Sequence, residues 1–134
     1  MNLLLDTHIL IWALNDDPHL PEKAKKMILD EDHAIYYSAV SIWEIAIKHA
    51  NHPENVEFTG EELSRFCREA GFLPVEMREK HVFALETLKR AEGAPPHQDP
   101  FDQMLIAQAK AENMLLITHD SLLRSYEEKC ILQV

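Results

Sequence analysis

The chain has 134 residues, of which 46% are hydrophobic and 27% charged, and its formal net charge is −10. This composition fits one globular domain, residues 1–134, and no apolar run approaches the roughly 20 residues that a membrane span needs. A charge of −10 disfavours extensive phosphate contact, which leaves local RNA contact or a basic partner protein. The N-terminus lacks a basic leader, and Cys67 and Cys130 form no CxxC pair, so we expect a cytoplasmic protein with reduced thiols.

Apolar periodicity predicts an alternation of strands and helices. In chain order, we expect strand 2–5, helix 7–15, helix 21–30, strand 34–38, helix 39–50, loop 51–60, helix 61–70, strand 72–75, helix 78–90, loop 91–98, helix 100–112, strand 114–118, short helix 121–127 and strand 130–134. The first strand is too apolar for a sheet with one face in water, and Pro74 places its strand at an edge or an end. This alternation predicts a parallel α/β sheet.

Carboxylates stand at several points where a strand ends or a helix begins. Asp6 and Asp120 follow predicted strands, Asp99 and Asp102 begin a predicted helix, and Glu44 lies within another. In parallel α/β sheets, ligands bind beyond the carboxyl ends of the strands. Four or five carboxylates in one pocket repel one another unless a divalent cation neutralises them. The pattern therefore predicts a Mg²⁺ or Mn²⁺ site and, with it, phosphodiester chemistry.

Each acid also has a purely structural explanation. Asp6 and Asp120 each precede a helix and could be its N-cap, and Asp99 in Asp-Pro-Phe-Asp has the same option. Glu44 stands four residues before Lys48, a spacing that favours an ion pair on a helix. Its neighbours are almost all apolar, however, and a buried carboxylate needs a cation or a firm partner. Because four coincidences would be needed at matching positions, the shared metal site is the better interpretation.

Other catalytic patterns are absent or weaker. The chain contains no GxSxG, GxGxxG or P-loop sequence. His97 and His119 lie next to the acids, but histidines in exposed loops usually have no catalytic role. Trp12 and Trp43 have apolar neighbours and are expected in the core.

Four segments in order carry a resemblance to a known family. They are residues 3–14 (LLLDTHILIWAL), 38–48 (SAVSIWEIAIK), 97–109 (HQDPFDQMLIAQA) and 115–126 (LLITHDSLLRSY). With these segments the chain resembles the PIN-domain family, most closely its VapC-like type II toxin branch. The resemblance implies a three-layer α/β/α sandwich with a central, mostly parallel sheet. It also implies a Mg²⁺- or Mn²⁺-dependent ribonuclease, a homodimer, and inhibition by a cognate antitoxin protein.

The same resemblance assigns roles to individual residues. The metal-binding and catalytic carboxylates match Asp6, Glu44, Asp102 and Asp120. Asp99 looks like an added acid near the metal. Ser41 and Thr118 are expected as hydrogen-bond partners of these carboxylates. Separately, hydrolysis by a metal-activated water makes the uncharged Thr7 a candidate to position that water. Many similar chains carry Arg after Asp-Pro-Phe-Asp, where this chain has Gln103.

The leading hypothesis is an RNA endonuclease of a toxin–antitoxin pair that hydrolyses phosphodiester bonds with a metal-activated water. Two alternatives remain open. One is a catalytically weak or inactive PIN-like module that binds or regulates a partner, which the −10 charge and Gln103 favour. The other is a metal-dependent nuclease or phosphatase that uses the same acids on another phosphoester.

Overall fold

A computed structural model describes all residues, 1–134. Five strands form one sheet in the order β3-β2-β1-β4-β5, and every neighbouring pair is parallel. The strands are β1 (Asn2–Leu5), β2 (Ala34–Ser38), β3 (Leu73–Val75), β4 (Leu115–Thr118) and β5 (Ile131–Gln133). The parallel sheet agrees with the sequence prediction, and Pro74 does lie in an edge strand. From β1 the chain builds outward through β2 and β3, then returns to add β4 and β5 on the other side.

Six α-helices and one 3₁₀ helix connect the strands. They are α1 (Thr7–Leu14), α2 (Glu22–Leu29), α3 (Ala39–Asn51), α4 (Gly60–Glu69), α5 (Glu79–Leu85), α6 (Pro100–Glu112) and the 3₁₀ helix η1 (Ser121–Ser125). None of the helices is long and apolar enough to cross a lipid bilayer. The predicted helix 78–90 ends early, because the segment after Leu85 bonds across to the end of η1. There the amide of Ala91 donates to Ser125 O at 2.7 Å, and the amide of Glu127 donates to Lys89 O at 2.8 Å.

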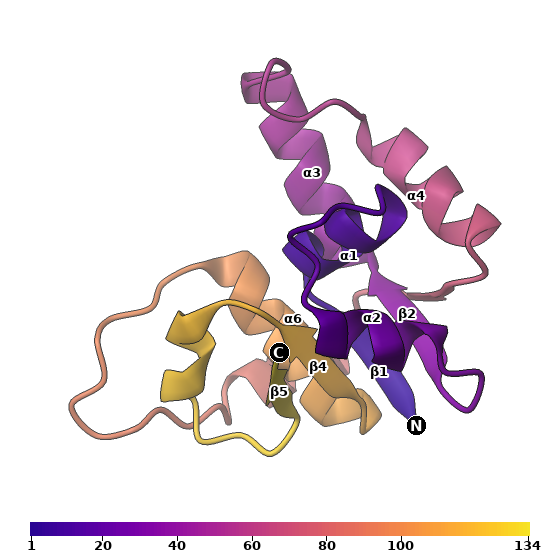
Figure 1. Ribbon diagram of the computed structural model, residues 1–134. Coiled ribbons are helices and arrows are strands. Elements are labelled where there is room, and N and C mark those ends of the chain that lie inside the picture. The colour runs from indigo at the N-terminus through magenta and orange to yellow at the C-terminus, as the bar shows by residue number, and fades with distance from the viewer.

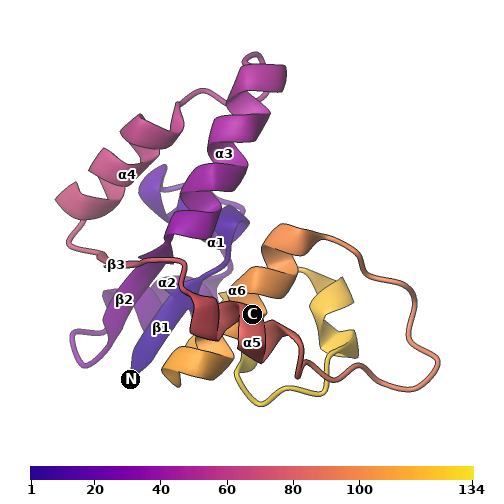
Figure 2. The same ribbon diagram turned by 180° about the vertical axis from the view of Figure 1, so that it is seen from behind.

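The sheet is covered on both faces, so the fold is a three-layer α/β/α sandwich. Leu3 and Leu5 point into one apolar core with residues of α1, α2 and α4, whereas Leu4 points into a second core with residues of α6. This alternation is the period of two that a strand imposes. The two views in Figures 1 and 2 show α1 and α2 on one face and α5 and α6 on the other. Burial on both faces explains why β1 is a run of leucines.

Helices α3 and α4 form a hairpin that extends away from the sheet (Figures 1 and 2). The hairpin is tight at Gly60, where an added Cβ would lie 3.1 Å from Ile42 O and 3.2 Å from the Ala46 Cβ. Trp43 lies on α3 and is 50% exposed, so the expectation that it belongs to the core is wrong. Its ring instead packs edge-on against Phe101, with the ring centroids 4.9 Å apart. This contact joins α3 to the start of α6.

Candidate metal centre

Asp6 directly follows β1 at the carboxyl end of the sheet, and both of its carboxylate oxygens are held. Oδ1 accepts from the amide of Thr7 at 2.7 Å, and Oδ2 accepts from Thr118 Oγ1 at 2.7 Å. The side chain begins α1, as the capping interpretation expects, yet the residue is only 4% exposed. Burial raises the pKa of Asp6, and the hydrogen bonds from Thr118 and Thr7 work in the opposite direction.

Asp120 follows the neighbouring strand β4. Strands β1 and β4 pair in parallel, with Leu5 opposite Ile117, so their carboxyl ends lie side by side. The amide of Asp120 donates to Thr118 Oγ1 at 3.1 Å, which links the two acids through one hydroxyl group. Asp120 Oδ1 accepts from the amide of Leu122 at 2.9 Å and so begins η1. Asp120 therefore has the capping role, and Oδ2 has no protein donor.

Glu44 reaches the same region from α3 and is 5% exposed. Its Oε1 accepts from Thr7 Oγ1 at 2.8 Å, and its Oε2 accepts from Lys48 Nζ at 2.6 Å. The ion pair expected from the four-residue spacing is therefore present, and Lys48 is committed to it. Ser41 Oγ lies 2.8 Å from Thr7 Oγ1, so Ser41 contacts this hydroxyl and no carboxylate. The Thr7 hydroxyl thus contacts Glu44 and Ser41. The role expected for it from the sequence, positioning a water molecule, stays a prediction.

Asp99 and Asp102 lie at the start of α6. Asp99 Oδ1 accepts from the amides of Phe101 and Asp102 at 2.9 and 3.3 Å, which is the N-cap geometry predicted for Asp-Pro-Phe-Asp. Asp102 is in the first turn, and its side chain is 15% exposed. Asp99 thus fixes the helix end that carries Asp102 into the cluster.

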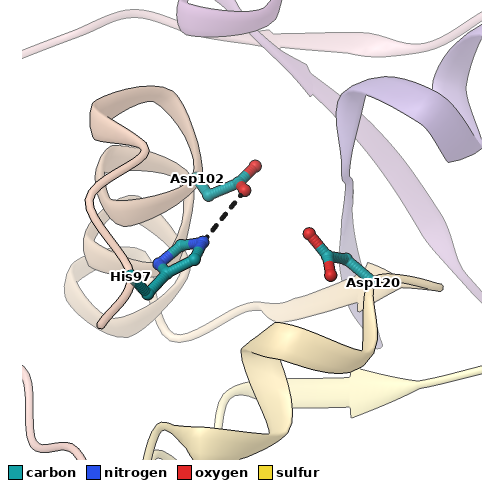
Figure 3. A group of neighbouring side chains, drawn as sticks. All are labelled: His97, Asp102 and Asp120. Atoms are coloured by element: carbon teal, nitrogen blue, oxygen red, sulfur yellow. Dashed lines mark ion pairs between the residues drawn. The ribbon is translucent and has the colours of Figure 1, made fainter. Parts of the chain in front are cut away.

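His97, which the sequence places beside the acids but which was expected to be an exposed loop residue without a role, lies in the cluster. It is 7% exposed, contrary to the expectation of an exposed loop, and its Nε2 lies 3.3 Å from Asp102 Oδ2. Figure 3 shows His97, Asp102 and Asp120 directed toward one another from the loop before α6, the first turn of α6 and the end of β4. One ligand atom from each of the three lies within 4.8 Å of the others. His119, by contrast, is exposed, and its Nδ1 lies 2.6 Å from Val134 O.

The electrostatics of Asp102 show that these acids share one region. The pKa of Asp102 is raised to about 8, first by burial and then by the negative charges of Asp6, Asp99, Glu44 and Asp120. Carboxylate oxygens are the ligands that Mg²⁺ and Mn²⁺ prefer, and a cation removes this repulsion. The donor set therefore fits a divalent cation.

A comparison with protein families identifies the family of the chain. The sequence model of the PIN domain matches residues 3–129. The chain belongs to the PIN domain family. No curated protein matches it in sequence.

Solved structures share the fold of this PIN domain. VapBC2 from Rickettsia felis, bound to a DNA fragment from its promoter, is 17% identical with a TM-score of 0.71, covering 100% of this chain and 99% of that chain. FitAB bound to an IR36 DNA fragment is 20% identical with a TM-score of 0.60, covering 89% of this chain and 85% of the other. FitAcB from Neisseria gonorrhoeae is 20% identical with a TM-score of 0.53, covering 89% and 88%.

Gln103, the departure from the pattern of similar chains, lies beside the cluster and does not point into it. Its Nε2 donates to His97 O at 3.1 Å and to the Tyr126 hydroxyl at 3.4 Å. This PIN domain also has a hollow of about 680 Å³ at the other end of the sheet, bordered by Asn2 and Leu115. None of the clustered acids lines that hollow. The carboxylate cluster and this cavity therefore lie at opposite ends of the strands.

Proposed function

We propose that this PIN domain is a Mg²⁺- or Mn²⁺-dependent RNA endonuclease and the toxin of a type II toxin–antitoxin pair. The single observation that carries the proposal is the convergence of carboxylates from separate segments at the carboxyl end of the sheet, where Asp6 and Glu44 are 4% and 5% exposed and ligand atoms of His97, Asp102 and Asp120 lie within 4.8 Å of one another. Folding this much negative charge together is costly without a cation. The similarity in fold to VapBC2 and FitAB supports the VapC-like resemblance that the sequence carries.

In this proposal Asp6, Glu44, Asp102 and Asp120 hold the cation. When bound, a divalent cation lowers the pKa of a water molecule and stabilises negative charge on a phosphate. The oxygens of Asp6 and Glu44 already accept hydrogen bonds, and each keeps a second lone pair for a ligand or a bridging water. Asp120 Oδ2 accepts no hydrogen bond from the protein, so it is free for direct coordination.

The accessory residues keep these carboxylates in place before a substrate arrives. Thr118 joins Asp6 to the backbone of Asp120, and Thr7 joins the start of α1 to Glu44 on α3. Ser41 supports Thr7. Such preorganisation removes the need to reorganise the site during the reaction.

The proposed partners are an RNA substrate, a cognate antitoxin and a second copy of the chain. The net charge of −10 limits RNA contact to the region around a bound cation, and it favours a basic antitoxin. The homodimer rests on the family resemblance. A cytoplasmic location agrees with Cys67 and Cys130, both of which are free thiols.

The test is cleavage of single-stranded RNA by the purified chain in Mg²⁺, in Mn²⁺ and in EDTA. We expect cleavage only with a cation, and loss of cleavage in Asp6→Asn. Asp32→Asn, a matched change on the exposed loop before β2, should leave cleavage intact. Cleavage that persists in EDTA or in Asp6→Asn would refute the mechanism.

A PIN-like binding or regulatory module without turnover is the second candidate, and the net charge of −10 favours it. It predicts no cleavage under any condition and no calorimetric signal from Mn²⁺ at millimolar concentration. Single- and double-stranded DNA and a small phosphomonoester, tested in the same assay, separate the RNA endonuclease from a nuclease or phosphatase with another substrate.

A further inference from the structure

Tyr126 carries a hydroxyl group whose hydrogen-bond partners determine where the proton of His97 lies. The residue is buried at the end of η1. Its hydroxyl lies 2.8 Å from His97 Nδ1 and accepts from Gln103 Nε2 at 3.4 Å. The guanidinium of Arg90 covers the Tyr126 ring at 5.0 Å and also bonds Ser125 Oγ at 2.7 Å, which holds the ring in place.

The orientation of the Gln103 amide is set by a second contact. Its Nε2 lies 3.1 Å from His97 O, and a backbone carbonyl only accepts, so the atom at this position must be the amide nitrogen. The nitrogen donates to the Tyr126 oxygen as well. The hydroxyl proton of Tyr126 therefore has one acceptor left, which is His97 Nδ1.

A neutral histidine that accepts at Nδ1 carries its proton on Nε2. That nitrogen lies 3.3 Å from Asp102 Oδ2 (Figure 3), so the protonated nitrogen is the one on the side of the carboxylate cluster. Without the Tyr126 hydroxyl, the ring could take the other tautomer. Its Nε2 lone pair would then face the cluster, within 4.8 Å of the Asp102 and Asp120 ligand atoms.

We propose that Gln103 and Tyr126 hold His97 through hydrogen bonds in the tautomer that carries its proton on Nε2, and that this relay keeps His97 from binding the cation. The proposal rests on the function proposed above, in which Asp102 is a cation ligand. The three are positioning residues, since none of them touches the substrate. The relay leaves the cation with oxygen ligands alone, which select Mg²⁺ or Mn²⁺, whereas an available imidazole suits Zn²⁺.

The tautomer can be measured without any cation or substrate. In the metal-free, ¹⁵N-labelled full chain, long-range ¹H–¹⁵N correlation spectra at a pH where the ring is neutral should show His97 protonated at Nε2. His97→Gln identifies the signal by removing it. Tyr126→Phe should shift the ring toward the Nδ1–H tautomer. An Nδ1–H ring in the unaltered protein would overturn the proposal, as would an unchanged tautomer in Tyr126→Phe.

Calorimetric titrations with Mg²⁺ and with Zn²⁺ measure the selectivity. We expect Tyr126→Phe to weaken Mg²⁺ binding by about tenfold, as for other changes behind a metal ligand, while Zn²⁺ binding does not weaken. Tyr36→Phe is the matched control and should leave both affinities unchanged, since no hydrogen bond involves its hydroxyl in the structure. Equal weakening of both cations in Tyr126→Phe would mean a merely structural role and would refute the relay.

Gln103 supplies the conservative test. Gln103→Arg keeps a donor for the Tyr126 oxygen and should preserve both the tautomer and the cation preference. Gln103→Leu removes the donor and should weaken Mg²⁺ binding. If the Gln103→Leu variant binds Mg²⁺ as tightly as the unaltered protein, Gln103 is not part of the relay. If the unaltered protein binds neither cation, the proposed function and the selectivity fail together, and the tautomer spectra alone decide whether the hydrogen-bonded chain exists.

Discussion

The metal-free protein should lose stability as the pH rises, because Asp102 binds its proton more tightly when folded. Its pKa is raised from 3.8 to about 8 in the folded chain. Between these values the folded state holds a proton that the unfolded state has released, so the free energy of unfolding falls with pH. The stability is complete below the unfolded pKa and is lost as the pH approaches 8.

The size of this loss follows from the width of that interval. About four pH units at roughly 1.36 kcal/mol each give an upper bound of about 6 kcal/mol. The side chain is 15% exposed and its carboxylate neighbours titrate with it, so we expect about half of this bound. A loss of ~3 kcal/mol is a large share of the stability of a small domain.

The assay is urea unfolding of EDTA-treated protein from pH 4.5 to 8, compared with Asp102→Asn. The variant removes the charge and keeps the shape, so it should be the more stable protein at pH 8 and lose less stability over the interval. Subtracting the two curves removes the titration of the histidines that both proteins share. Saturating Mg²⁺ should remove the loss in the unaltered protein, because binding to the folded state alone adds stability.

Asp32→Asn is the control for the loss of one acid, and its curve should run parallel to that of the unaltered protein. The reasoning is refuted if the metal-free protein is as stable at pH 8 as at pH 5, or if Asp102→Asn gains nothing at pH 8. Either result would mean that water or a positive charge stabilises the Asp102 carboxylate, and that burial among the other acids does not raise its pKa.

Three further changes test the supports of the site. Thr118→Val removes the 2.7 Å hydrogen bond to the Asp6 carboxylate and should lower the free energy of unfolding, measured by urea denaturation, by about 2 kcal/mol. Thr118→Ser keeps the hydroxyl group and should lose much less. Lys48→Met leaves Glu44 without its 2.6 Å ion pair; because Lys48 is half exposed, chemical denaturation should show only about 1 kcal/mol lost, and an undiminished midpoint would contradict the pairing. Gly60→Ala places a methyl group 3.1 Å from Ile42 O and should lower the melting temperature by several degrees, so an unchanged melting temperature would show that the α3–α4 hairpin is not tight.

The features that the sequence predicts well are those that depend on neighbouring residues. The run Leu3–Leu5 is buried on both faces because strand periodicity and hydrophobicity act locally. The acids at strand ends are predictable for a different reason: each strand can be recognised locally, and a parallel sheet then brings the carboxyl ends of distant strands together. Asp99 begins α6 as its Asp-Pro pair predicts.

The features that the sequence analysis missed depend on partners far along the chain. His97 is buried because Tyr126, 29 residues later, bonds its ring, and nothing in the residues next to His97 announces this. Helix α5 ends at Leu85 because the following residues bond to the end of η1. Trp43 has apolar neighbours on its helix, yet α3 leaves the sheet and exposes it. Only tertiary packing decides such cases.

The bond between Thr118 and Asp6 joins residues 112 positions apart. A ribosome-bound nascent chain that has reached Glu112 already contains Asp6, but it lacks β4, which carries Thr118, and Asp120, which follows β4. The carboxylate cluster therefore cannot be completed during synthesis until the segment from β4 to Asp120 has emerged from the ribosome.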